Sequence, residues 1–367
     1  MKTKKKIIKS SLRRVAVRKK KEDPKEEKSV KTVVLIRPKE NPIISPNVES
    51  SWESWQTFNP GVILLENKIH FLYRAIGKDG ISRLGYAVSG DGFKIDERLP
   101  QPVYEHPLIN NPSFYIFSFA SGGSFGGCED PRPVRVNKED ILYMTYTACD
   151  QRLRVGLTSI KVNDFLNKKW QWNPPVLISP PGQVHKNWVI FPEKIKGRYA
   201  ILHSLSPQIS IDFFDNLKFD GKTYIDSYHE KEPKGSHWNW EGRIRGVGPS
   251  PVKTKEGWLI FYHAEDRRDP GKYKVGAMLL DLEEPTKVLC CAKEPILEPN
   301  GLYDSNGFKP GVVYVSGAVV KNNNLLIYYG SSDSYVCVAY SNFEEFLGVL
   351  KKDVKPKLKT RVLKKKI

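Results

Sequence analysis

A phrase of two strands recurs five times along this chain, and this repeat restricts the fold more than any other feature of the sequence. Each copy has an apolar strand, a turn, and an aromatic-rich strand that ends in small or polar residues. The copies cover residues 59–75, 129–148, 191–204, 249–264 and 316–331, and their second strands end 57 to 73 residues apart. Because strand repeats of this length are typical of propeller blades, we predict an all-β fold, a five-bladed β-propeller.

The positive charge of the chain is concentrated at its two ends. Of the net charge of +18, residues 1–30 contribute +9 and residues 351–367 contribute +8, which leaves +1 for residues 31–350. We therefore expect a basic, disordered tail over residues 1–30, a propeller catalytic domain over residues 31–350 and a second such tail over residues 351–367. The tails can bind anionic surfaces weakly, and no specific nucleic-acid partner is predicted.

Cysteine usage and hydropathy indicate a cytoplasmic protein. No run of eighteen apolar residues is present, so no membrane span is predicted, and the basic N-terminal stretch lacks the apolar core of a signal peptide. The five cysteines are odd in number and have no CxxC spacing, which indicates free thiols in a reducing compartment and no metal site. A homo-oligomer is compatible with the sequence.

The starts and ends of the phrases carry candidate site residues. In a propeller, matching positions of different copies converge on one channel, and here they include Asn59, Asp130, Arg74 and His263. Asp130 directly precedes Pro131, which favours an extended backbone and would hold the carboxyl at the mouth of a strand. A partly desolvated carboxyl can be protonated near neutral pH and act as a general acid. The alternative for Asp130 is an Asx turn that caps the strand.

Tryptophan residues gather at the phrase boundaries rather than inside the periodic strands. Indole rings stack on the apolar faces of sugars, while nearby polar side chains bind the hydroxyls. The run His-Trp-Asn-Trp-Glu at residues 237–241 is too polar for a core strand, so it favours a carbohydrate site, although core packing is the alternative for any single tryptophan. The boundary tryptophans are Trp52, Trp55, Trp188, Trp238 and Trp240.

The order of motifs resembles glycoside hydrolase family 130, the β-mannoside phosphorylases and β-mannosidases. The resemblance covers residues 38–348. It is carried by Glu40–Ile43, Asn59–Gly61, Tyr73–Ala75, Ser82–Ala87, Glu129–Arg132, Phe191–Lys194, Gly257–Leu259, Tyr262–His263, Gly276–Leu282, Pro295–Pro299, Ser316–Ala318 and Tyr328–Gly330.

The resemblance implies a five-bladed propeller and an inverting reaction on a β-mannoside, with no metal or organic cofactor. Asp130 would be the general acid, acting through a sugar hydroxyl in the phosphorylases, where inorganic phosphate is the co-substrate. The residues expected to contact the substrate are Asn59, Arg74, Glu129, Arg132, Trp188, Trp240 and Asp304.

A phosphate nucleophile requires several cations or donors near the anomeric carbon. The candidates are Lys186, Asn187, Arg243, Arg245, His263 and Tyr273. Two positions depart from the phosphorylases, because Ser204 stands where they carry arginine and Ile244 where they carry lysine. Arg243 and Arg245 flank Ile244, but adjacent strand positions face opposite ways, so one of them could substitute only at a bulge.

These departures favour hydrolysis over phosphorolysis, because each charge-assisted contact to an anion is worth about 1.5–3 kcal/mol. Water would need a carboxylate base, and Glu241, the preferred candidate, Glu265 and Asp266 are available. One alternative is a phosphorylase of β-1,4-mannooligosaccharides or mannosylglucose that releases mannose 1-phosphate. An arabinanase-like propeller would need a third acid at a matching position, and we find none. A non-catalytic propeller that binds a glycan or a protein would not need a positioned acid.

Overall fold

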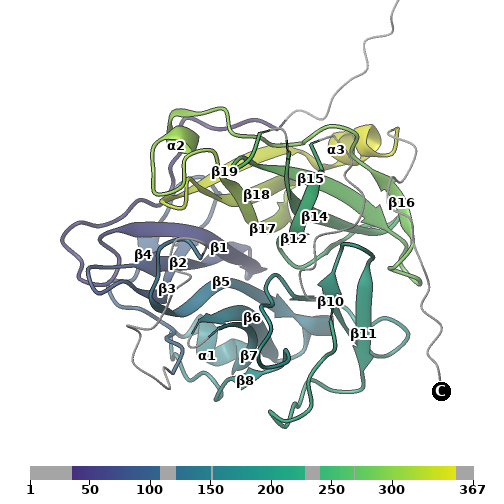
Figure 1. The fold of residues 1–367 in the computed structure, drawn as a ribbon, viewed down its shortest axis with the longest axis horizontal. Helices are drawn as coiled ribbons and strands as arrows, with labels where there is room; N and C mark the ends of the chain where they lie inside the picture. The colour runs from purple at the N-terminus through teal and green to yellow at the C-terminus, as the bar shows by residue number, and fades with distance from the viewer. Residues whose placement is uncertain (1–34, 108–120, 150–151, 228–239, 268, 353–367) are drawn as a thin grey trace, which may run out of the picture. The chain divides into compact units, whose positions relative to one another are not determined.

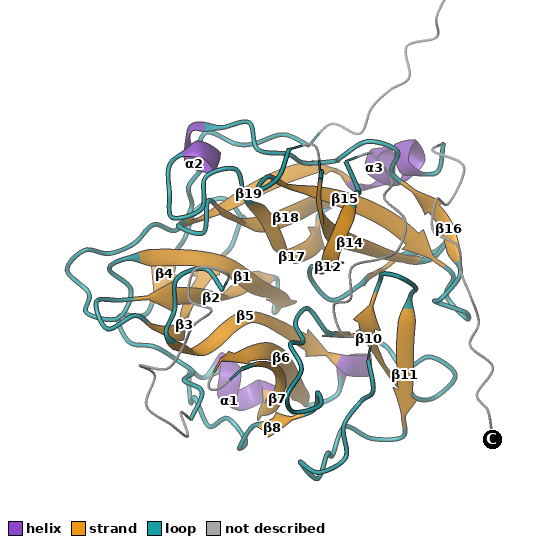
Figure 2. Cartoon of the chain, viewed as in Figure 1, coloured by secondary structure: helices purple, strands orange, loops and turns teal. Residues whose placement is uncertain are grey.

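The structure is a computed structural model that describes residues 35–107, 121–149, 152–227, 240–267 and 269–352 (Figure 1). The chain divides into two units, Met1–Lys31 and Thr32–Ile367, and everything described here belongs to the second. The two predicted tails lie outside the described residues, except for Lys351 and Lys352. Strands dominate the cartoon in Figure 2. None of the described helices is long and apolar enough to cross a membrane.

The largest sheet has eight strands and contains the first two phrases. Its strands run in the order β1-β2-β3-β5-β6-β7-β8, and β4 pairs with β3. The bounds are β1 (Gln56–Leu65), β2 (Lys68–Ile76), β3 (Ile81–Ser89), β4 (Glu97–Arg98), β5 (Gly126–Arg135), β6 (Ile141–Cys149), β7 (Leu153–Lys161) and β8 (Val176–Leu177).

Three smaller sheets contain the remaining phrases. The second sheet has the order β11-β10-β9, from β9 (Val189–Ile190), β10 (Tyr199–Ser204) and β11 (Ser210–Phe214). The third has the order β12-β14-β15-β16 with β13 on β14, from β12 (Arg243–Val247), β13 (Val252–Lys253), β14 (Trp258–Glu265), β15 (Tyr273–Leu280) and β16 (Val288–Cys291). The fourth has the order β17-β18-β19, from β17 (Val313–Lys321), β18 (Asn324–Ser331) and β19 (Tyr335–Asn342).

Within the described residues, helical structure is confined to short segments. These are η2 (Val136–Lys138), α1 (Val162–Leu166), α2 (Leu302–Ser305) and α3 (Phe343–Leu350). The Asn342 side chain accepts a hydrogen bond from the amide of Glu345 and so caps α3. Buried Phe346, Leu347 and Leu350 pack the helix against the core shared by the third and fourth sheets.

The prediction of a five-bladed propeller is wrong for the sheets that the structure describes. Propeller blades are separate sheets, whereas β3 and β5 pair in parallel, Ile81 with Gly126 and Ser82 with Gly127. This pairing joins two phrases into one sheet, and the strand orders show four unequal sheets rather than a closed ring of five. The repeat in the sequence predicts the recurring hairpin. It does not predict which edge strands of neighbouring hairpins pair with each other.

The phrases themselves form antiparallel strand pairs, as predicted. The clearest are β1 with β2, β5 with β6, and β17 with β18. Two of these hairpins turn through two residues with positive φ, Glu66 and Asn67 in the first and Asn322 and Asn323 in the last. This backbone matches the twist of the flanking strands, and asparagine tolerates it better than most residues.

A tyrosine of the second strand is buried in three copies against a glycine of the next strand. Tyr73 pairs with Gly85, Tyr146 with Gly156 and Tyr262 with Gly276. A Cβ atom at these glycines would lie 2.2, 2.5 and 2.2 Å from the facing phenol ring. The aromatic strand of each phrase therefore needs a glycine opposite its tyrosine, and this pairing keeps the polar strand ends in register.

Candidate active site

A cavity of about 380 Å³ gathers residues from all four sheets. Its volume lies within the range of about 300–1,000 Å³ that is usual for ligand sites. The residues that line it include Asn59, Arg74, Asp130, Lys186, Asn187, Trp188, His203, Ser204, Ile244, Arg245, Tyr273, Lys309, Tyr314 and Asp333. Phrase positions that are far apart in sequence therefore meet in one place.

Asp130 is held by a pair of matched bulges. The register of β1 shifts between Phe58 and Gly61, and that of β5 between Glu129 and Arg132. Within them, Asn59 and Asp130 adopt positive φ values of 45° and 50°. The expected extended backbone at Asp130 is therefore wrong, because the bulge overrides the preference set by the following proline. The amide Nδ2 of Asn59 donates to Oδ1 of Asp130 at 2.8 Å.

A cluster of buried charges surrounds this carboxylate. Arg74 places Nη1 at 3.5 Å from Oδ1 of Asp130 and Nη2 at 3.2 Å from Oε1 of Glu129. Lys186 places Nζ at 2.9 Å from Oε2 of Glu129. Glu129 does not line the cavity, so it holds the two cations from behind while they face the cavity.

The charges set the ionisation of Asp130. Burial raises its pKa, but the charges of Arg74, Lys186 and Arg132 and the hydrogen bond from Asn59 outweigh burial and lower the pKa to about 2. In the free protein, Asp130 is therefore an anion at neutral pH. The expectation of a carboxyl protonated near neutrality took account of desolvation alone and omitted the neighbouring cations.

Arg132 connects Asp130 to the other side of the cavity. Its Nη1 donates to the backbone oxygen of Asp130 at 2.6 Å, and its Nη2 donates to Oδ1 of Asn187 at 2.8 Å and to the hydroxyl of Tyr314 at 3.2 Å. The hydroxyl of Tyr314 donates to the same Asn187 oxygen at 2.5 Å. The Nδ2 of Asn187 in turn donates to the backbone oxygen of Arg245 at 3.0 Å.

A bulge brings Arg245 to the cavity beside Ile244. The register between β12 and β14 shifts between Ile244 and Gly246, so Arg245 is the extra residue. Gly246 has a φ of 133°, and a Cβ there would lie 2.7 Å from Nδ2 of Asn187. The guanidinium of Arg245 lies 5.6 Å from the ring centroid of Tyr273. The bulge thus brings the cation of Arg245 to the cavity next to Ile244, the position where the phosphorylases are expected to carry lysine.

The two remaining candidates for binding phosphate, Arg243 and His263, do not line the cavity. Arg243 does not line the cavity, and its Nη1 lies 4.0 Å from Oε2 of Glu265. His263 is fully buried beneath Tyr314, with ring centroids 3.8 Å apart, and its Nε2 lies 2.6 Å from the backbone oxygen of Val315. Burial lowers the pKa of His263 to about 3, so its imidazole is neutral at neutral pH.

The three carboxylates considered as a base do not line the cavity. Glu265 accepts a hydrogen bond from the amide of Gly271 at 3.0 Å, and Asp266 is buried. Glu241 accepts a hydrogen bond from the hydroxyl of Tyr262. Trp240 stacks on the same Tyr262 ring, with centroids 6.1 Å apart, and donates to the backbone oxygen of Lys293.

The Trp240–Glu241 pair repeats an arrangement that lies just before the first phrase. Trp52 stacks on Tyr73, with centroids 6.4 Å apart, and Glu53 accepts a hydrogen bond from the hydroxyl of Tyr73 at 2.7 Å. Trp52 also donates its indole N–H to a backbone oxygen, that of Pro100. In two copies, therefore, the tryptophan of a Trp-Glu dipeptide stacks on the buried tyrosine and the glutamate accepts a hydrogen bond from its hydroxyl.

Of the remaining candidates, Trp188 lines the cavity and Asp304 does not. Trp188 is buried between His185 and His203, with ring centroids 5.4 and 5.5 Å away. Asp304 accepts a hydrogen bond from Ser331 at 2.6 Å and pairs with Arg37 at 3.3 Å. Trp238 lies outside the described residues.

The cavity residues that sequence reasoning missed include Lys309, Tyr314 and Asp333. Oδ2 of Asp333 lies 3.6 Å from Nζ of Lys309. Burial raises the pKa of Asp333, and the charges of Lys309 and Arg74 oppose that rise. Asp333 follows the aromatic strand of the fifth phrase, so the convergence argument could have found it if the turn after each strand had been included. No group of three or more His, Cys, Asp or Glu residues in the described parts of the chain could hold a metal ion.

Comparisons with known proteins agree over most of the chain. The family model described as Glyco_hydro_130, beta-1,4-mannooligosaccharide phosphorylase, matches residues 21–352. A 1,2-beta-oligomannan phosphorylase from Thermoanaerobacter sp. (strain X514) is 36% identical over 316 residues, which cover 84% of this chain and 97% of the relative. A beta-1,2-mannobiose phosphorylase from the same strain is 33% identical over 320 residues, which cover 83% of this chain and 96% of the relative.

A solved structure shares the fold. The beta-1,2-mannobiose phosphorylase from Listeria innocua, in complex with beta-1,2-mannobiose, has a TM-score of 0.65 and 25% identity, and the match covers 87% of this chain and 99% of that one. The two relatives described above are named as phosphorylases, so the predicted preference for hydrolysis is not supported. The chain belongs to glycoside hydrolase family 130 and is an enzyme that acts on glycosides.

Proposed function

We propose that the enzyme is a phosphorylase of β-1,2-linked oligomannosides that releases mannose 1-phosphate. The observation that carries this proposal is the bulge in β12, which gives the cavity the cation Arg245 beside Ile244. The names of the relatives that match over most of the chain support both the β-1,2 linkage and phosphate as the second substrate.

The cavity is equipped to hold an anion. Lys186 and Arg245 both line it, together with Tyr273, whose ring lies under the Arg245 guanidinium. Burial lowers the pKa of Lys186, but the charges of Glu129 and Asp130 outweigh burial and raise it, so this ammonium stays protonated. A phosphate dianion between these two cations would gain charge-assisted hydrogen bonds worth about 1.5–3 kcal/mol each.

In the proposed reaction, a phosphate oxygen attacks the anomeric carbon of the terminal mannose while the bond from that carbon to the bridging oxygen breaks. The bridging oxygen gains a proton and leaves as a hydroxyl of the shortened chain. Asp130 supplies this proton through a mannose hydroxyl. Since Asp130 is ionised in the free protein, it must first take up a proton when substrates bind, and a nearby phosphate dianion raises its pKa by offsetting the charge of Lys186.

Product analysis tests the proposal. The enzyme is incubated with β-1,2-mannobiose and, separately, with β-1,4-mannobiose, with and without millimolar phosphate. We expect mannose 1-phosphate from the β-1,2-linked disaccharide only when phosphate is present. Free mannose formed at the same rate in both conditions would contradict phosphorolysis, and a faster reaction of the β-1,4-linked disaccharide would contradict the linkage.

A further inference from the structure

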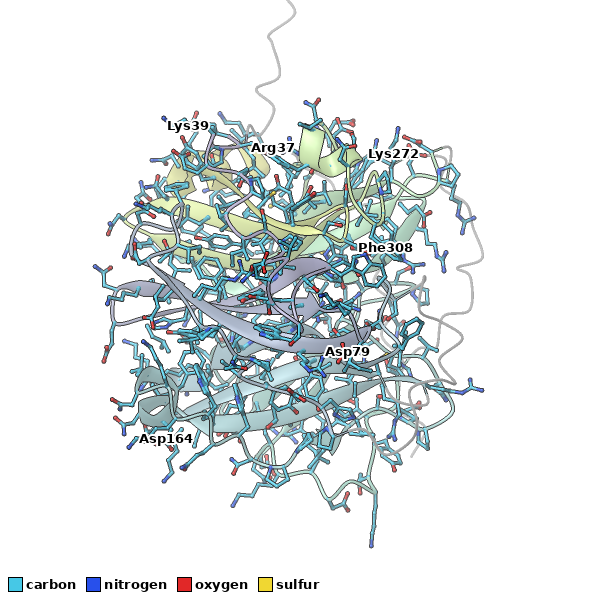
Figure 3. All side chains as sticks on the ribbon, turned by 90° about the vertical axis from the view of Figure 1, so that its left-hand side faces the viewer. Arg37, Lys39, Asp79, Asp164, Lys272 and Phe308 are labelled. Atoms are coloured by element: carbon cyan, nitrogen blue, oxygen red, sulfur yellow. The ribbon has the colours of Figure 1, made fainter. Side chains whose placement is uncertain are left out.

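An aromatic pair, exposed Trp55 and half-buried Phe308, lies next to residues that line the cavity, and the proposed reaction does not use it. Trp55 is 45% exposed, and its ring meets that of Phe308 edge to face with centroids 5.2 Å apart. Figure 3 shows Phe308 on the face that is turned to the left in Figure 1, between the labels of Asp79 and Lys272 in that view. We call Trp55 and Phe308 the rim pair.

Trp55 is fixed to the cavity wall through the next residue. Gln56 is fully buried, and its Nε2 donates to the backbone oxygen of Gly122 at 2.9 Å and to that of Asp333 at 2.6 Å. Gly122 and Asp333 both line the cavity. The first residue of β1, directly after Trp55, is therefore bound to two segments of the cavity wall.

Phe308 is also fixed close to the cavity wall. Its backbone amide donates to Oγ of Ser334 at 2.9 Å. The next residue, Lys309, lines the cavity, and its Nζ lies 3.6 Å from Oδ2 of Asp333. One short segment thus presents an aromatic ring at the rim and an ammonium group inside the cavity, and both are adjacent to the turn that carries Asp333.

This combination of groups matches a sugar ring. A pyranose has an apolar C–H face that packs on an aromatic ring and hydroxyls that accept hydrogen bonds from an ammonium group. A cavity of about 380 Å³ is near the lower end of the usual range for ligand sites. A chain longer than the cavity must continue over its rim, where a rigid aromatic surface costs little entropy to contact.

We propose that the rim pair is a binding subsite for the third mannosyl ring of the oligosaccharide, counted from the non-reducing end, with Lys309 donating to its hydroxyls. This inference rests on the proposed function, because it assumes that the terminal ring reacts inside the cavity. It makes the enzyme selective for chains of three or more mannosyl units over the disaccharide.

The test compares chain-length preference. Values of kcat/KM for phosphorolysis of β-1,2-mannobiose and β-1,2-mannotriose are measured for the wild type, Trp55→Ala, Phe308→Ala and Trp55→Tyr. We expect Trp55→Ala to lower the trisaccharide value about three- to tenfold, the range that one aromatic contact supports, with the disaccharide value unchanged. Phe308→Ala should have a smaller effect of the same kind, and Trp55→Tyr should keep the preference because a ring remains.

Leu289→Ala is the matched control, since Leu289 is an exposed apolar residue on β16 that does not line the cavity. An unchanged ratio of the two values in Trp55→Ala, or an equal loss on both substrates, would overturn the subsite. So would a change of sedimentation coefficient without a change in the ratio, which would assign Trp55 to a contact with a second copy of the chain. A wild type that releases no mannose 1-phosphate from either substrate would overturn the proposed function as well, which separates the two failures.

Discussion

Asp130 and Glu241 are the two acidic residues that the sequence favours for catalysis, and the structure gives them opposite surroundings. Asp130 lines the cavity, with Asn59, Arg74 and Arg132 all bonded to it. Glu241 does not line the cavity and accepts a hydrogen bond from the buried Tyr262, as Glu53 does from Tyr73. A carboxylate that accepts a hydrogen bond from the repeated tyrosine therefore has a structural role. A carboxylate that lies at a bulge beside several cations is instead placed to take part in the reaction.

The largest effect is expected at Asp130. Asp130→Asn removes the proton donor with almost no change of volume, so the rate of phosphorolysis should fall by about 10²–10⁴, the usual contribution of a general acid. Initial rates of mannose 1-phosphate release measure the loss, and circular dichroism checks that the variant is folded. A folded variant that retains more than a tenth of the wild-type rate would remove Asp130 from the reaction.

The next effect is expected at the bulge in β12. Arg245→Met should raise the KM for phosphate about 10- to 150-fold, because it removes one charge-assisted contact to the anion. Arg243→Met is the matched control, since Arg243 is two residues away but does not line the cavity. If both variants changed the phosphate KM equally, or neither did, Arg245 would not be the cation that compensates for Ile244.

A smaller effect, on stability rather than on activity, is expected at the two Trp-Glu pairs. Glu241→Gln and Glu53→Gln each weaken a hydrogen bond to a buried tyrosine, so each should lower the free energy of unfolding by about 1–3 kcal/mol. Urea denaturation measures both. Glu53 also pairs with Arg98 at 2.6 Å, so its loss should be the larger. A loss in both variants would support a shared structural role, whereas a Glu241→Gln variant as stable as the wild type would show that Glu241 does not stabilise the fold.

An effect of similar size is expected on stability in acid. The folded-state pKa of Asp130 is about 2, below the ordinary value of 3.8, so the anion stabilises the fold above pH 4 and this contribution is lost as the pH falls toward 2. Relative to Asp130→Asn, the wild type should therefore lose about 2 kcal/mol of unfolding free energy between pH 5 and pH 2. A difference that stays constant over this range would show that Arg74 and Lys186 do not favour the anion.

Local features of the site could be read from the sequence, while long-range pairing could not. The repeated order of apolar strand, turn and aromatic-rich strand predicts the hairpins, and the opposite facing of adjacent strand positions predicts that a flanking arginine replaces the cation missing at Ile244 only at a bulge. The parallel pairing of β3 with β5 was not predictable, because it involves only two residues of each strand and leaves no periodic signal. The positive φ of Asp130 was missed for a related reason, since it depends on the bulge shared with Asn59.

Other features of the sequence also bear on the site. The dipeptide Trp-Glu occurs at residues 52–53 and 240–241, each before a phrase, and this recurrence would have identified Glu241 as part of the repeat. Tyr314 carried no signal, because an aromatic residue at the start of an apolar strand looks like core. Its hydroxyl between Arg132 and Asn187 is visible only in three dimensions.

The most direct test of the distinction between the cavity and the scaffold is the rate of mannose 1-phosphate release by Glu241→Gln at a temperature well below its unfolding transition, measured beside Asp130→Asn. We predict that Glu241→Gln retains a rate within about threefold of the wild type, because its side chain faces Tyr262 and not the cavity. A loss as large as that of Asp130→Asn, in a variant that remains folded, would contradict the account and return Glu241 to the reaction.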